Sequence, residues 1–223
     1  MYKTVRAKIH KETRQGTILY VLAPNESLTD ELSKLEAEDG LLKGELKIDD
    51  GRHISSDQRK RAYATIADIA IHTGYLPEEL KEIMKYWYIA ETGADYFSLS
   101  DCSMTTARLF INYLIDFAMK WEIPLMDTAI NRTDDISAAL YSSLMHKRCI
   151  CCGKAGELHH EDVVGAGRNR KQIIHLGMKV ICLCRKHHAE AEKIGRETFN
   201  ERYKVYGISA DKKICKVWNL KTQ

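Results

Sequence analysis

The segment CICCGKAGELHH, residues 149–160, and the later segment HLGMKVICLCRKHH, residues 175–188, hold five of the seven cysteines of this chain. Cys149 and Cys152 form one pair with two residues between them, and Cys184 and His187 form a second pair at the same spacing. Such pairs are typical of tetrahedral zinc sites, and four protein ligands leave no open position on the ion. The sequence therefore predicts a structural zinc ion that holds a small, loop-rich domain together.

Spacing alone does not fix all four zinc ligands. His159 or His160 could replace His187, and Cys151 or Cys182 could replace a neighbouring cysteine. The cysteines could also pack as small apolar residues, although two correctly spaced pairs argue against this. Because the cysteines are clustered rather than spread along the chain, we expect metal ligation in a reducing compartment and not a disulfide scaffold.

Three histidines, His159, His160 and His188, remain if zinc uses the two pairs. On a strand, His159 and His160 face opposite ways, so one can bind a metal while the other accepts a proton from water. His188 begins a helical stretch on which Glu192 shares its face. We expect His159, His188 and Glu192 to hold a second divalent ion, with His160 as general base of phosphodiester hydrolysis. The alternative is that some of these histidines only bind zinc or contact phosphate.

The charge is unevenly distributed along the chain. Residues 146–223 contain 17 Lys and Arg against 8 Asp and Glu, a formal charge of +9, whereas residues 1–145 contain 17 against 23, a charge of −6. We expect the basic part to meet a polyanion, and the acidic part to meet protein or to bind through a local patch. The N-terminus lacks a signal-peptide pattern and no apolar run approaches the ~20 residues of a membrane span, which predicts a soluble, cytoplasmic protein with no membrane partner.

Outside the metal segment, the pattern of apolar residues predicts a mixed α+β fold. The expected elements are strands over residues 2–9, 17–23 and 44–49, and helices over 27–35, 55–73, 77–91 and 103–121. Tyr86, Trp87 and Tyr88 could stack on nucleic-acid bases, but aromatic residues in a helical pattern are more often core. Residues 127–135 are polar and are interpreted as a linker, followed by a connecting helix over 136–146. We therefore divide the chain into residues 1–130, a linker with connecting helix over 131–145, and residues 146–223.

The order and spacing of these residues resemble the HNH endonucleases of the ββα-metal type, in the zinc-knuckle subclass found in phage and bacterial genomes. The resemblance covers residues 146–207. It implies that His159 ligates the catalytic Mg²⁺ or Mn²⁺, that His160 is the general base and that His188 is another metal ligand.

Two positions depart from that family pattern. Lys179 stands where the motif carries its central Asn, and Glu192 stands where relatives more often carry His. The Asn braces the loop between the strands, and His175 is the candidate substitute. The two pairs, Cys149 with Cys152 and Cys184 with His187, are called the first and second knuckle below. Between them lie three basic residues, Arg168, Arg170 and Lys171, which are predicted to contact the DNA backbone. The alternative is that they belong to a solvated loop.

The stretch RHISSDQRKRAYATIADIA, residues 52–70, resembles the phage-lambda Orf/NinB recombination-protein family, with Asp57-Gln58-Arg59 opening a long helix. This weaker resemblance covers residues 50–125. It implies single-stranded DNA binding, a homodimer, and contact with the host single-strand-binding protein. Arg59, Lys60 and Arg61 are then the expected phosphate contacts, although an exposed basic helix face is an equal alternative.

The expected protein is therefore an α+β phage recombination nuclease. An N-terminal DNA-binding domain carries a C-terminal, zinc-stabilised HNH domain that cuts single-stranded or branched DNA. The alternative is a recombination mediator that binds zinc and single-stranded DNA but does not cut, which the Lys179 departure favours. A thiol redox protein built on Cys149 and Cys152 would leave the second knuckle unexplained.

Overall fold

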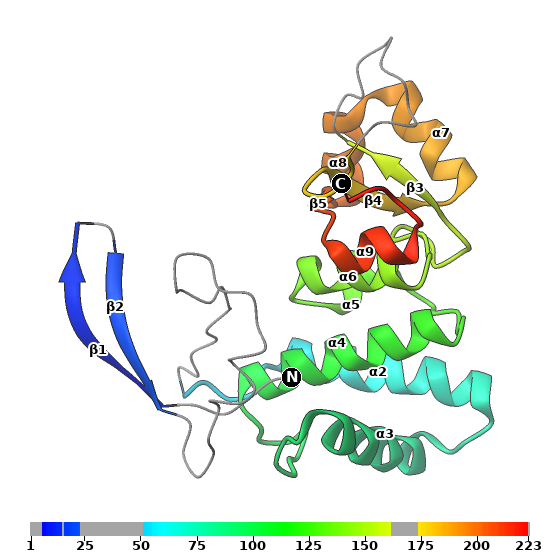
Figure 1. The fold of residues 1–223 in the computed structure, drawn as a ribbon. Coiled ribbons are helices and arrows are strands. Elements are labelled where there is room, and N and C mark those ends of the chain that lie inside the picture. The colour runs from blue at the N-terminus through cyan, green and yellow to red at the C-terminus, as the bar shows by residue number, and fades with distance from the viewer. Residues whose placement is uncertain (1–5, 15, 23–50, 162–173, 223) are drawn as a thin grey trace.

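The protein has a mixed α+β fold, as its sequence predicts. The computed structural model describes residues 6–14, 16–22, 51–161 and 174–222. Figure 1 places a layer of long helices at one end of the molecule and a small sheet with short helices at the other. A β-hairpin lies to one side.

The hairpin is formed by β1 (Arg6–Thr13) and β2 (Gly16–Leu22), which pair antiparallel with a bulge between Ile9 and Lys11. The strands predicted over residues 2–9 and 17–23 are confirmed where the structure describes them, and β1 continues to Thr13. The predicted helix over residues 27–35 and the predicted strand over 44–49 lie outside the described residues.

The helical layer consists of α2 (Ser56–Thr73), α3 (Pro77–Thr92) and α4 (Met104–Lys120). Local signals set the helix ends. Ser55 caps α2 in a capping box with Gln58, Pro77 opens α3, and the Ser103 side chain accepts from Thr106 N at the start of α4. Gly74 and Gly93 follow α2 and α3 in the left-handed conformation, which glycine adopts without strain.

The predicted linker over residues 127–135 is partly helical and packs against the helical layer. It contains α5 (Ala129–Arg132), and the Arg132 guanidinium is buried with Asp68 of α2, Nη2 to Oδ2 2.8 Å. A buried carboxylate and guanidinium that pair with each other avoid the cost of an unpaired buried charge. The segment thus fastens the helical layer to α6 (Ile136–Met145), the predicted connecting helix.

The C-terminal module is a three-stranded antiparallel sheet with helices beside it. β4 (Lys179–Leu183) lies between β3 (Glu157–His160) and the short β5 (Ile208–Ser209). The helices of this module are α7 (Arg185–Ile194), α8 (Arg196–Tyr203) and α9 (Lys212–Val217).

The helical layer and the C-terminal module share one hydrophobic core in the described part of the chain. One cluster of buried residues runs from Ile54 and Ile66 through Phe110 and Leu140 to Leu183. A separate core for an N-terminal domain is therefore not seen, and the division near residue 130 stays a prediction. None of the helices in the described ranges is long and apolar enough to span a membrane.

Candidate metal centres and active site

Cys149, Cys152, Cys184 and His187 converge on one point, with all four ligand atoms within 4.8 Å of one another. His187 Nδ1 lies 3.4 Å from Cys149 Sγ and 3.2 Å from Cys184 Sγ, and the sulfurs of Cys152 and Cys184 are 3.7 Å apart. Ligand atoms in a tetrahedral zinc shell are about 3.6–3.8 Å apart, given their usual bond lengths. The residues therefore fit a structural zinc ion.

The cluster also selects among the ligand sets that the sequence left open. Cys151 and Cys182 are buried outside the cluster, and His159 and His160 lie on β3 rather than in it. Among the described residues it is the one group of three or more Cys, His, Asp or Glu side chains that converges in this way. A hydrogen bond from the Cys151 thiol lowers the pKa of Cys149 to about 4, which favours the thiolate form that zinc requires.

Backbone hydrogen bonds close the first knuckle into a tight turn. Gly153 N donates to Cys149 O at 2.8 Å, with Gly153 at φ 69°, and Ile150 N donates to Cys182 O at 3.1 Å. The second of these bonds attaches the knuckle to β4, so the four candidate zinc ligands are carried by a shared framework.

The second knuckle is built into the start of α7. Cys184 is the N-cap residue, and His187 follows in the first turn. The His187 ring packs edge-on against Tyr203 of α8 with centroids 5.1 Å apart, and the Tyr203 hydroxyl donates to Glu190 Oε2 at 2.9 Å. The two helices therefore help to hold the imidazole in place.

Gly156 is required by a close approach inside the knuckle. A Cβ at this position would lie 2.4 Å from Cys182 Sγ and 3.1 Å from Cys149 N. Cys182 is fully buried, so its sulfur cannot easily move aside.

We predict that Gly156→Ala lowers the free energy of unfolding by about 1–3 kcal/mol, the usual cost of overpacking. Urea denaturation would measure it. The matched control is the same substitution in a Cys182→Ala background, where the clashing sulfur is gone. The added cost of Gly156→Ala should be much smaller there, and equal costs in both backgrounds would contradict the steric explanation.

Of the three remaining histidines, His159 and His160 are consecutive on β3 and contact different neighbours, as expected for residues on opposite faces of a strand. The rings of His159 and His188 meet edge to face, with centroids 4.6 Å apart, so β3 and α7 bring these two imidazoles together. The His160 ring instead lies 5.2 Å from the ring of His175. Burial and the neighbouring His188 lower the pKa of His159, so its ring is neutral near pH 7 and can offer a nitrogen lone pair.

Two carboxylates lie near the pair formed by His159 and His188. Glu157 Oε2 is 3.9 Å from His188 Nδ1, which leaves Nε2 of that ring for another partner. Glu192 is exposed on α7, and its charge acts on His159. Among the described residues, His159, His188 and Glu192 do not converge as closely as the four zinc ligands do.

Glu161 is a residue of this region that sequence reasoning missed. Asn200 Nδ2 donates to its Oε1 at 3.0 Å, and Arg196 Nη1 donates to its backbone oxygen at 2.8 Å. Gly207 leaves room for the carboxylate, since a Cβ there would lie 2.6 Å from Oε2. The end of the strand that carries His159 and His160 is thus held by α8. Only its position directly after the two histidines could have singled out Glu161.

The basic residues expected to contact DNA have different surroundings. Arg168, Arg170 and Lys171 lie outside the described residues. Arg59 donates from Nε to Leu99 O at 3.0 Å and from Nη2 to Ser100 O at 2.7 Å, and Arg61 forms an ion pair with Asp134.

Arg59 and Arg61 therefore also bind groups of the protein itself, and their contact with phosphate stays a prediction. Lys60 is highly exposed, and among the described residues its ion-pair partner is Asp57, at a long 3.9 Å. The predicted phosphate contact of Lys60 is retained as well.

A cluster of two Cys/His pairs, set beside a histidine pair on a strand and a following helix, is the arrangement expected from the resemblance to HNH endonucleases. In agreement, the family model described as "Putative HNHc nuclease" matches residues 27–221. The chain belongs to this family, and the match includes the helical layer as well as the sheet module. No curated protein and no solved structure matches the chain.

Proposed function

We propose that this protein is an endonuclease that hydrolyses DNA phosphodiester bonds, using a divalent metal ion and His160 as the general base. The observation that carries the proposal is the meeting of His159 and His188, 4.6 Å between ring centroids, next to the strand position of His160. A pair of imidazoles can hold Mg²⁺ or Mn²⁺ while leaving positions for phosphate oxygens and water. The exposed carboxylate of Glu192 is the proposed third ligand.

Each residue has a distinct task in this proposal. His159 and His188 hold the cation, which, when bound, would neutralise charge on the phosphate and on the leaving oxygen. His160 takes the proton from the attacking water, because imidazole is the side chain most often used as a general base near neutral pH. His175, whose ring adjoins that of His160, would orient this base in place of the missing Asn. The 5′-phosphate and 3′-hydroxyl ends follow from the family resemblance.

The zinc ion would have a structural task in the same site. His187 points to the zinc ligands and the next residue, His188, meets His159. The knuckle therefore fixes the helix start from which a catalytic-metal ligand projects.

The finer assignments rest on the two sequence resemblances. We propose a phage recombination setting, with single-stranded or branched DNA as substrate. A homodimer and contact with the host single-strand-binding protein belong to the same proposal. The excess of Lys and Arg over residues 146–223 supports a nucleic-acid substrate.

We predict that His188→Ala raises the Mn²⁺ concentration needed for half-maximal cleavage by about tenfold or more, because one metal ligand is lost. Nicking of supercoiled plasmid at increasing Mn²⁺ would measure it. Lys186→Ala is the matched control, since this exposed neighbour on α7 is not a proposed ligand. An unchanged Mn²⁺ dependence in His188→Ala would remove this residue from the metal site. Failure of a folded, zinc-loaded and DNA-binding wild-type protein to cut would favour the mediator instead.

A further inference from the structure

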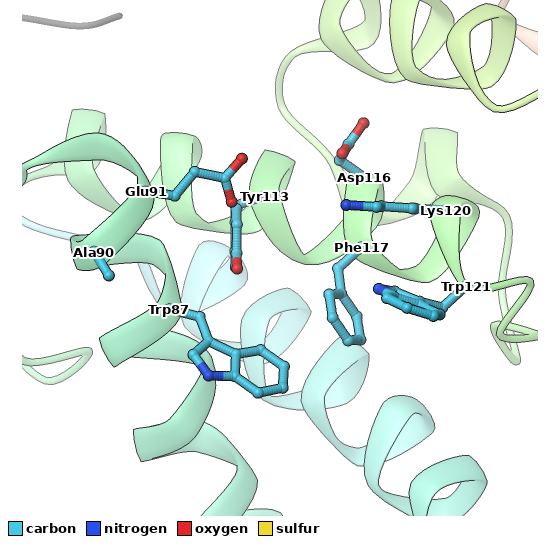
Figure 2. Close-up of a pocket in the computed structure, with 8 residues that line it drawn as sticks. All are labelled: Trp87, Ala90, Glu91, Tyr113, Asp116, Phe117, Lys120 and Trp121. Atoms are coloured by element: carbon cyan, nitrogen blue, oxygen red, sulfur yellow. The ribbon is translucent and has the colours of Figure 1, made fainter.

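An aromatic groove lies between α3 and α4 in the helical layer. It encloses about 460 Å³, and Figure 2 shows the rings of Trp87, Phe117 and Trp121 along one wall, with Glu91 and Asp116 above them. The centroids of Trp87 and Phe117 are 5.8 Å apart, and those of Phe117 and Trp121 are 6.2 Å apart.

The two tryptophans are more exposed than packing of the helical core requires. Trp87 is 48% exposed and Trp121 is 59% exposed, whereas the neighbouring Tyr88 is buried. The sequence left open whether residues 86–88 are core or binding residues, and the structure divides them. Large aromatic rings at the surface that line a hollow mark binding sites more often than isolated exposed residues do.

The charged groups that line the groove indicate which kind of ligand it can bind. Asp116 accepts hydrogen bonds from His146 Nε2 at 2.9 Å and Ser142 Oγ at 2.7 Å. Burial opposes its ionisation, but these bonds outweigh burial and lower the pKa of the carboxyl. Burial raises the pKa of Tyr113 to about 12, and the charges of Glu91 and Asp116 add to this effect. The wall opposite the rings therefore carries two carboxylates, Glu91 and Asp116, with Lys120 beside Asp116.

A cation fits this combination of groups better than an anion does. Aromatic faces attract cations through their negative centres, and carboxylates bind guanidinium groups through paired hydrogen bonds. Lys120 lies at the Trp121 end of the groove, with its Nζ 5.9 Å from the centroid of that ring. A cationic ligand would therefore bind at the other end, which is lined by Trp87 and Glu91. The phosphates of single-stranded DNA would face the Glu91 carboxylate there.

We propose that this groove binds an arginine side chain of a partner protein, with the guanidinium stacked on Trp87 and paired with Glu91. Arginine is favoured over lysine because its flat guanidinium can stack on a ring and bind a carboxylate at the same time. The net charge of −6 over residues 1–145 supports a basic protein partner for this part of the chain. This site is separate from the nuclease site and does not depend on the proposed cleavage.

The indole NH signals of the three tryptophans allow a direct test by NMR. The protein is titrated with Nα-acetyl-arginine methylamide and, in parallel, with the citrulline analogue, which has the same shape but no charge. We expect saturable shifts of the Trp87 and Trp121 signals with the arginine probe, and binding of the citrulline probe at least about fivefold weaker. Trp218 is the internal reference, because its indole donates to Leu144 O at 2.8 Å outside the groove.

Two variants connect the binding to the named residues. Glu91→Gln should weaken the arginine probe about fivefold or more, whereas Tyr86→Ala, which removes an exposed ring outside the groove lining, should not change it. Cleavage of naked DNA by Glu91→Gln should equal that of the wild type. A failure of the arginine-binding proposal can therefore be distinguished from a failure of the nuclease proposal. Equal binding of both probes, no shift of Trp87 and Trp121, or displacement of the arginine probe by a short oligothymidylate would overturn the arginine site.

Discussion

Replacement of His160 by alanine is expected to lower the rate of DNA cleavage by a factor of about 10²–10⁴, the range for loss of a general base. His160 is half-buried on β3, opposite Val180 of β4. Its ring lies beside that of His175 and not in the zinc cluster. Removal of the ring therefore takes away a proton acceptor without removing a zinc ligand. Zinc content and DNA binding should remain those of the wild type.

Single-turnover cleavage at saturating Mn²⁺ measures this effect without a contribution from product release. His72→Ala is a suitable control, because His72 is an exposed histidine at the end of α2. Cleavage by His160→Ala within a factor of about three of the wild type would exclude His160 as the base. His175 would then be the next candidate for the general base.

Replacement of Cys149 by serine is expected to unfold the C-terminal module. Cys149 is fully buried, and its sulfur lies 3.4 Å from His187 Nδ1 in the zinc cluster. Structural zinc contributes about 10–16 kcal/mol of apparent binding free energy in small zinc-dependent domains, which exceeds the stability of most domains. Loss of one thiolate opens the shell around the ion and removes much of this contribution.

Zinc content by atomic absorption and the dispersion of the NMR spectrum measure the outcome. Cys102→Ser makes the same chemical change at a buried cysteine outside the metal cluster, and should keep its zinc and its folded spectrum. A well-dispersed spectrum of the C-terminal residues in Cys149→Ser would contradict a zinc-dependent fold. Cleavage should be lost together with zinc even at high Mn²⁺, because His187 and His188 are consecutive on α7.

The helix ends and the zinc cluster could be predicted from the sequence because their signals are local. The Ser55–Gln58 capping box, Pro77 and Gly93 each act within a few residues of the helix end that they define. The two knuckles have a fixed spacing within each pair, and only their meeting is long-range. The pairing of His159 with His188 was likewise predicted, through the resemblance to HNH endonucleases.

The parts that were missed depend on contacts between distant segments. The polarity of residues 127–135 gives no sign that Arg132 pairs with Asp68, 64 residues earlier. The support of Glu161 by Asn200 spans 39 residues and has no spacing rule. Similarly, the aromatic groove exists because α3 and α4 lie side by side with Trp87 and Trp121 facing the same hollow.

The most direct measurement of the central claim is an assay of purified protein on circular single-stranded DNA and supercoiled duplex DNA, with Mg²⁺, Mn²⁺ or EDTA. We expect cutting that requires the added metal, stops in EDTA and is lost in His160→Ala. Preference for the single-stranded circle would support the substrate inferred from the Orf/NinB resemblance. A zinc-loaded, folded protein that binds DNA but cuts neither substrate with either metal would contradict the nuclease assignment.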